Sequence, residues 1–136
     1  MSAAPGPART VVVVDDDDDF REIFVEALRL EGIHVLEVPA GELAVALFER
    51  LARSREQDPA LLVLDLMMPA MSGIEVLQRI RRGPRWSELP VLIMTAVNDP
   101  MLSVRLDVPV VFKPDIDALL TAVRQNLLQN ELALGR

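Results

Sequence analysis

The sequence predicts an α/β fold: one doubly wound domain in which a parallel sheet carries helices on both faces. Short apolar runs alternate strictly with segments of helical periodicity, and this alternation is typical of βα units. The runs are continuously apolar, as expected of strands that are buried on both faces. With 136 residues the chain has the length of a single domain, and its sequence contains no internal repeat or central linker.

The first half of the chain contains two strand and helix pairs. Val11 to Val14 is an unbroken β-branched run that predicts a buried strand. Apolar residues at helical spacing follow from Phe20 to Leu28, and Gly32 is expected to end that helix. A second strand is predicted at Ile33 to Val38, and a second helix over Leu43 to Leu51.

The second half repeats this alternation. Strands are expected at Leu61 to Leu64, Val91 to Met94 and Val110 to Phe112. Helices are expected from Ile74 to about Gly83 and from Ile116 to Leu127. The segment between the fourth and fifth strands, around Met101 to Leu106, has no clear pattern.

The two ends of the chain differ from its middle. We expect residues 1–9, which are rich in Ala, Pro and Gly, to be a flexible leader, residues 10–130 to fold, and residues 131–136 to form a tail. The leader lacks the basic start and apolar core of a signal peptide. No apolar stretch reaches the roughly 18 residues that a membrane span needs. We therefore expect a cytoplasmic protein that makes no membrane contact.

Composition excludes several classes of function. Acidic residues outnumber basic ones by 21 to 14, and the resulting net charge of −7 opposes non-specific binding to nucleic acid or to anionic membranes. The absence of cysteine excludes disulfides and thiol chemistry. The single histidine, His34, excludes a multi-histidine metal site. The protein must therefore work largely with carboxylates.

Polar residues follow four of the predicted strands, at the edge where parallel sheets bind ligands. The acidic run from Asp15 to Asp19 follows the first strand, Asp65 the third, Thr95 the fourth and Lys113 the fifth. Crowded carboxylates favour a bound cation, and hard oxygen ligands suit Mg²⁺, or alternatively Mn²⁺. A lysine opposite them would pair with an anion such as a phosphate that accompanies Mg²⁺.

Five short motifs at these strand ends are similar to those of a known family. They are Val13-Val14-Asp15-Asp16, Asp65-Leu66-Met67-Met68-Pro69, the later Gly73, Met94-Thr95-Ala96 and Phe112-Lys113-Pro114. Together they resemble the receiver domain of two-component response regulators over nearly the whole chain. The resemblance implies a flavodoxin-like (βα)5 fold with sheet order 2-1-3-4-5. Since the sequence shows no segment for an output domain, we expect a response regulator receiver that stands alone.

The resemblance also implies a chemistry for the acidic residues. Asp65 would accept a phosphoryl group from a histidine kinase or a histidine phosphotransfer protein. Asp16 and Asp65 would bind Mg²⁺ directly, Asp15 would bind it through a water, and the main-chain carbonyl of Met67 would complete the protein ligands. The three acids at Asp17 to Asp19 are expected to be a solvated turn that opens a helix instead.

The remaining site residues and partners follow from the same resemblance. Lys113 would pair with the phosphoryl oxygens, and the hydroxyl of Thr95 would donate a hydrogen bond to one of them. The protein would catalyse only its own phosphorylation and dephosphorylation. It would signal through protein–protein contacts with a downstream partner, as a monomer or a weak homodimer.

The sequence departs from the family pattern between the fourth strand and the last helix. The stretch from Thr95 to Lys113 is short, so we expect a shortened fourth helix. Val110 takes the place of an aromatic residue that moves with the threonine in most receivers, and Asp115 replaces the aromatic after Lys-Pro. An alternative is therefore a receiver fold that binds its partner independently of phosphorylation. A phosphohydrolase is disfavoured, because Met67 occupies the position of its second acid.

Overall fold

The computed structural model describes residues 9–134 and confirms the predicted fold class. Five parallel strands form one sheet in the order β2-β1-β3-β4-β5. The strands are β1 (Thr10–Val14), β2 (His34–Val38), β3 (Leu61–Asp65), β4 (Val91–Thr95) and β5 (Val110–Phe112). The helices are α1 (Asp18–Leu30), α2 (Gly41–Ala52), α3 (Gly73–Arg82), α4 (Leu102–Leu106) and α5 (Ile116–Leu134), with a short 3₁₀ turn η1 (Pro84–Trp86) before β4.

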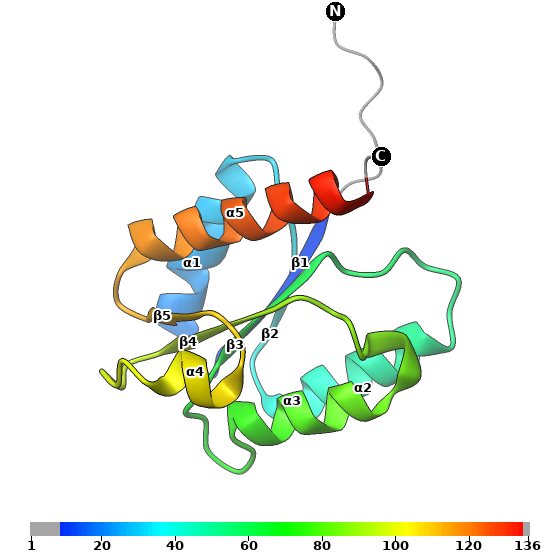
Figure 1. The fold of residues 1–136 in the computed structure, drawn as a ribbon, viewed down its shortest axis with the longest axis horizontal. Helices are drawn as coiled ribbons and strands as arrows, with labels where there is room; N and C mark the ends of the chain where they lie inside the picture. The colour runs from blue at the N-terminus through cyan, green and yellow to red at the C-terminus, as the bar shows by residue number, and fades with distance from the viewer. Residues whose placement is uncertain (1–8, 135–136) are drawn as a thin grey trace, which may run out of the picture.

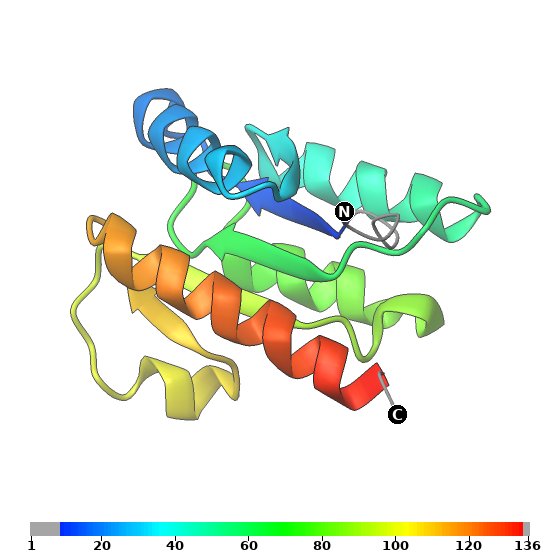
Figure 2. The same ribbon diagram turned by 90° about the horizontal axis from the view of Figure 1, so that it is seen from above.

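The helices cover the sheet in two layers (Figures 1 and 2). Helices α1 and α5 pack on one face, and α2, α3 and α4 pack on the other. Alternate residues of each buried strand enter alternate layers: Val12 and Val14 belong to the α2/α3 side, whereas Val11 and Val13 belong to the α1/α5 side. This two-sided burial explains why the strands are continuously apolar.

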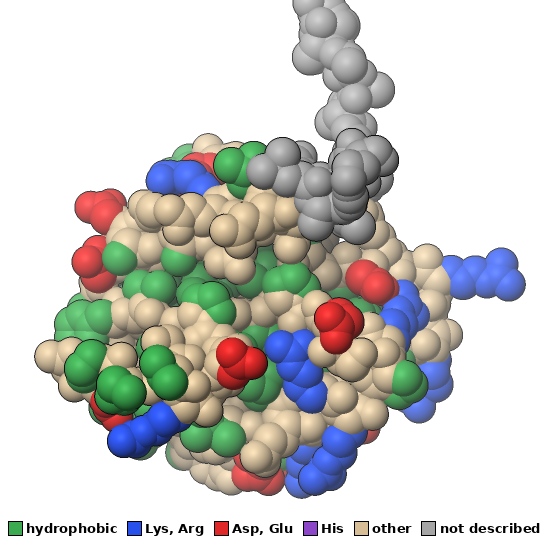
Figure 3. Space-filling model, in the orientation of Figure 1, with side chains coloured by type: hydrophobic (Ala, Val, Ile, Leu, Met, Phe, Trp, Pro, Cys, Tyr) green, Lys and Arg blue, Asp and Glu red, His purple; other side chains and the backbone are tan. Residues whose placement is uncertain are grey.

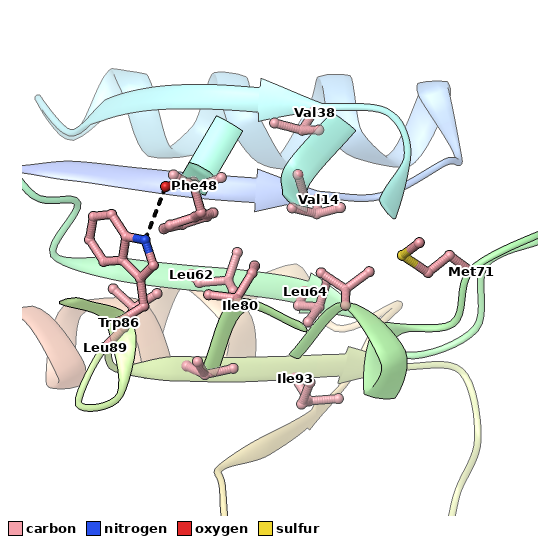
Figure 4. Packing of buried hydrophobic residues seen from close by; sticks show 14 of the residues in the cluster. Val14, Val38, Phe48, Leu62, Leu64, Met71, Ile80, Trp86, Leu89 and Ile93 are labelled. Carbon is pink, nitrogen blue, oxygen red and sulfur yellow. Dashed lines mark hydrogen bonds between the residues drawn. The ribbon is translucent and has the colours of Figure 1, made fainter. Parts of the chain in front are cut away.

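The core on the α2/α3 side is closed at its two ends by different residues (Figure 4). Trp86 lies where the strands begin, and Met71 lies where they end. The Trp86 side chain is buried, its Nε1 donates a 3.0 Å hydrogen bond to the carbonyl of Phe48, and the two rings meet edge to face. The tryptophan thus fixes η1 against α2 at the end of the sheet remote from the acidic residues.

Short polar side chains begin three of the helices. Asp17 accepts a hydrogen bond from the Phe20 amide at the start of α1, and Ser72 caps α3. Asp115 accepts a 2.9 Å bond from the Ala118 amide at the start of α5. The acid that replaces the expected aromatic after Lys113-Pro114 therefore has a structural role as a helix cap.

The fourth helix is short, as predicted. It spans five residues, Leu102–Leu106, and its C-cap Asp107 adopts a left-handed conformation with φ of 55°. Leu102 and Leu106 pack on the core, whereas Val104 is 68% exposed. One helical turn with two anchoring leucines leaves this side of β5 thinly covered.

The ends of the folded region differ slightly from the expected limits. Residues 1–8 of the expected leader, and residues 135–136 of the expected tail, lie outside the described residues. Helix α5 continues to Leu134, so residues 131–134 of the expected tail are helical. Among the described residues, none of the helices is both long enough and apolar enough to span a bilayer.

Candidate functional site

The carboxyl ends of the strands bring three acids together, because parallel strands all end at one edge of the sheet. Carboxylate oxygens of Asp15, Asp16 and Asp65 lie within 4.8 Å of one another. Asp15 and Asp65 are buried, with exposed fractions of 0% and 2%, whereas Asp16 is exposed. The site is therefore an acidic pocket in which two carboxylates are buried and the third is open to solvent.

Lys113 provides the positive charge in this pocket. Its Nζ donates hydrogen bonds to Asp15 Oδ1 at 3.0 Å and to Asp65 Oδ2 at 3.3 Å. Its backbone amide donates a 2.7 Å bond to the carbonyl of Thr95, which ties the end of β5 to the end of β4. The ring of Phe20 lies 5.1 Å from Nζ and adds a cation–π contact from α1.

Burial controls the charge of Asp65. Burial raises the pKa of Asp65 to about 6, the Asp15 carboxylate acts in the same direction, and Lys113 opposes both. For Lys113, burial alone would lower the pKa, but the two carboxylates outweigh it and the pKa is raised. Asp65 is therefore mainly ionised at neutral pH, and Lys113 remains charged.

The environment of Asp15 fits a bound cation. Asp15 Oδ1 accepts a 2.9 Å hydrogen bond from the Asp17 amide, as well as the bond from Lys113. Asp15 Oδ2 is buried and accepts no hydrogen bond from the described residues, although the Lys113 ammonium lies 3.0 Å away. A buried carboxylate oxygen with an incomplete set of donors, beside two further carboxylates, is suited to a hard divalent cation.

The loop after β3 carries the predicted ligand Met67. The Met67 amide donates a 3.3 Å hydrogen bond to Asp65 Oδ1, and the side chain is 63% exposed. Further along this loop Ala70 adopts a left-handed conformation with φ of 66°. The loop then returns to the sheet at Gly73, whose Cα faces the backbone of Asp65 and Leu66 so closely that a Cβ atom would collide with it.

Thr95 lies at the end of β4, one residue beyond the position that pairs with Asp65. Its side chain is 1% exposed. The hydroxyl oxygen accepts a 2.9 Å hydrogen bond from the Val97 amide and so orders the start of the following loop. The structure therefore places all six predicted site residues on one edge of the sheet.

Two contributors were not identified from the sequence as parts of the site. Phe20 was assigned only to the apolar stripe of its helix, yet its ring contacts the ammonium of Lys113. Arg21 was not singled out, yet its guanidinium donates a hydrogen bond to the backbone of Asp15. The available sequence signal for Arg21 is its position one helical turn after Asp18, within an otherwise acidic segment.

Comparison with known proteins identifies matches over most of the chain. The family model described as the response regulator receiver domain matches residues 11–124. The probable transcriptional regulatory protein TcrX of Mycobacterium tuberculosis is 40% identical over 97 residues, which cover 71% of this chain and 38% of that relative. The match thus spans well under half of TcrX.

Solved structures extend the comparison to the fold. The response regulator protein TrrA from Thermotoga maritima, in complex with Mg²⁺ and BeF, is 30% identical with a TM-score of 0.71, covering 88% of this chain and 99% of that one. A CheY-like receiver domain protein from Methanospirillum hungatei is 19% identical with a TM-score of 0.77, covering 93% and 99%. This second likeness shows the fold alone.

Proposed function

The chain belongs to the family of response regulator receiver domains, and from this premise we propose that Asp65 is its phosphoacceptor. The observation that carries the proposal is the convergence of Asp15, Asp16 and Asp65 with the ammonium of Lys113. The phosphoryl donor is a histidine kinase or a histidine phosphotransfer protein.

The transfer needs little covalent chemistry from the protein. An oxygen of the Asp65 carboxylate attacks phosphorus, the P–O bond forms as the P–N bond to the donor histidine breaks, and the released imidazole nitrogen takes up a proton. Lys113 neutralises charge on the transferring group, and the Thr95 hydroxyl donates a hydrogen bond to one of its oxygens. The pKa of Asp65 at about 6 leaves the nucleophile ionised at neutral pH.

Magnesium completes the proposed site. Asp16 and Asp65 would bind it directly, Asp15 through a water, and the carbonyl of Met67 as a further ligand. When bound, Mg²⁺ supplies positive charge to the phosphoryl oxygens. The clustering of carboxylate oxygens of Asp15, Asp16 and Asp65 within 4.8 Å of one another supports this assignment. Mn²⁺ has the same preference for oxygen ligands and would serve in its place.

The proposed role is that of a switch in the cytoplasm rather than of an enzyme acting on a separate substrate. The protein catalyses only its own phosphorylation and dephosphorylation, and the phosphorylated form acts on a downstream protein. It does so as a monomer or a weak homodimer. Its net charge of −7 opposes non-specific contact with nucleic acid and anionic membranes.

A phosphorylation assay tests this proposal directly. Incubation with acetyl phosphate and Mg²⁺ should add one phosphoryl group, detected by intact mass, in an acid-stable and base-labile linkage. Asp65→Asn should abolish the adduct, whereas Asp19→Asn, at an exposed position of the neighbouring acidic turn, should retain it. An unmodified wild-type protein, or an equal adduct on Asp65→Asn, would show that the proposed phosphoacceptor is wrong.

A second candidate is a receiver fold that binds a partner without using phosphate. Two features favour it: Val110 instead of an aromatic residue, and an α4 of only five residues. Beryllofluoride with Mg²⁺ mimics the phosphorylated state, and amide NMR signals report which segments respond. Changes that reach α4 and β5 support switching, whereas changes confined to the acidic pocket support the second candidate.

A further inference from the structure

Arg21 is the most enclosed arginine of helix α1, with 12% of its side chain exposed. Its guanidinium contacts three segments of the chain. One terminal nitrogen donates a 2.6 Å hydrogen bond to the Asp15 carbonyl, the other donates a 2.7 Å bond to Asp18, and Nε donates a 3.2 Å bond to Glu37. The fork therefore joins the end of β1, the start of α1 and strand β2.

A second arginine on the same helix provides a contrast. Arg29 also reaches Glu37, at 3.5 Å, but its side chain is 52% exposed. Its other hydrogen bond goes to the carbonyl of Val35, the second residue of β2. Arg29 thus shares the acidic partner of Arg21, and both of these hydrogen bonds go to β2 rather than to the acidic pocket, which makes Arg29 a matched reference.

The bond to the Asp15 carbonyl acts on both neighbouring acids. That carbonyl belongs to the peptide unit that links Asp15 to Asp16, so its orientation sets the directions in which the two side chains leave the backbone. The Asp15 amide is held separately, by a 3.1 Å bond to the Val38 carbonyl, and the Asp17 amide binds Asp15 Oδ1. Arg21 holds the Asp15 carbonyl, which lies between these two hydrogen-bonded amides.

We propose that Arg21 is a positioning residue of the acidic pocket, which holds the Asp15–Asp16 peptide so that both carboxylates converge with Asp65 on a divalent cation. The inference rests on the proposed function for the identity of that cation. Arg21 acts through the backbone and does not touch the phosphoryl group. Its planar fork serves three acceptors at once, which a lysine ammonium at the same position would not reproduce.

Two measurements on Arg21→Met, Arg21→Lys and Arg29→Met test this. Isothermal titration with Mg²⁺ should show affinity weakened about tenfold or more in Arg21→Met, the usual cost of removing a residue that orients metal ligands. Arg29→Met should stay within about twofold of wild type, as expected for an exposed ion pair. Arg21→Lys should fall between them, because it restores the charge and loses the fork.

Amide hydrogen exchange without metal provides the second measurement. Exchange at the Asp17 amide, which binds Asp15 Oδ1, should accelerate in Arg21→Met and remain unchanged in Arg29→Met. Equal Mg²⁺ affinity and equal Asp17 exchange in wild type and Arg21→Met would overturn the inference. If Arg21→Met does not fold, unchanged affinity and exchange in Arg21→Lys would overturn it equally. Wild type that fails to bind Mg²⁺ would instead overturn the proposed function, while the exchange measurement still decides the role of Arg21.

Discussion

Asp65 is placed where its charge opposes folding. The carboxyl group is buried at the end of β3, close to Asp15, and within residues 9–134 the two negative charges form ion pairs with Lys113 alone. An acid with a purely structural role in this position would stabilise the fold more beside a neutral side chain than beside a second carboxylate. The pocket therefore has a lower stability at the proposed phosphoacceptor, as expected of groups with perturbed pKa values at functional sites.

We predict that Asp65→Asn stabilises the protein at neutral pH. The folded pKa of about 6 lies above the ordinary value of 3.8, so the stability that Asp65 contributes is present below pH 4 and is lost as pH rises through 6. The shift of about two pKa units corresponds to about 2–3 kcal/mol. Urea unfolding at pH 7.5 without metal should therefore give a higher free energy of unfolding for Asp65→Asn than for wild type.

The pH profile provides the control for this prediction. The advantage of Asp65→Asn should shrink towards pH 4, where the wild-type carboxyl group is protonated in the folded state. Asp19→Asn removes the same charge at an exposed side chain in the first turn of α1, and should alter stability little at either pH. A less stable Asp65→Asn at pH 7.5 would contradict the prediction.

At the scale of helices and strands, local sequence patterns were enough to predict the elements and the edge of the sheet where the acids meet. Continuous apolar runs predicted four of the five strands, and the shorter, mixed segment at β2 was predicted from its place between two helices. The residues after the strands predicted which acids meet Lys113, because the ends of parallel strands share one edge. The short α4 followed from the shortened segment between Thr95 and Lys113. The contacts of Phe20 and Arg21 were missed, since they depend on how α1 is rotated against β1 and β5.

The connection between β3 and α3 depends on the absence of a side chain at Gly73. A Cβ atom there would lie 2.9 Å from Leu66 Cα and would also collide with the Asp65 carbonyl, both of which are backbone atoms. We predict that Gly73→Ala destabilises the fold by about 2–3 kcal/mol and weakens Mg²⁺ binding, because the displaced backbone carries Asp65. Urea unfolding and Mg²⁺ titration measure the two effects.

Gly32→Ala separates backbone displacement from general destabilisation. Gly32 adopts φ of +82° with no atom within 4 Å of a Cβ position, so alanine there meets only the left-handed strain of about 1 kcal/mol. Its unfolding free energy should fall, while its Mg²⁺ affinity stays at the wild-type value. Equal Mg²⁺ affinity in Gly73→Ala and wild type would show that the loop tolerates the shift.

Across the whole molecule, the two ends of the core serve different purposes. Trp86 closes the end where the strands begin, with its indole bonded to Phe48, and Arg85 holds the loop after α2 through the carbonyls of Leu51 and Ser54. The opposite end holds buried charge. Exposed apolar side chains gather over α4 and the loop before it (Figure 3), among them Val97 and Met101. The packing around Trp86 thus stabilises the end of the sheet where the strands begin, and it offsets the unfavourable electrostatics of the acidic pocket at the end where they stop.

A cation bound in the pocket should stabilise the whole fold, because it binds the folded chain in preference to the unfolded one. At a Mg²⁺ concentration about 100 times its Kd the gain is about 2.7 kcal/mol, which raises the Tm of a domain of this size by roughly 10 °C. Protons compete with the cation at Asp65, whose pKa is about 6, so the rise in Tm should be larger at pH 8 than at pH 5. Differential scanning calorimetry of wild type, Asp65→Asn and Asp19→Asn measures it. Asp65→Asn should lose most of the rise and the exposed Asp19→Asn should keep it, whereas a wild-type Tm that does not respond to Mg²⁺ at pH 8 would show that the three carboxylates do not form a cation site.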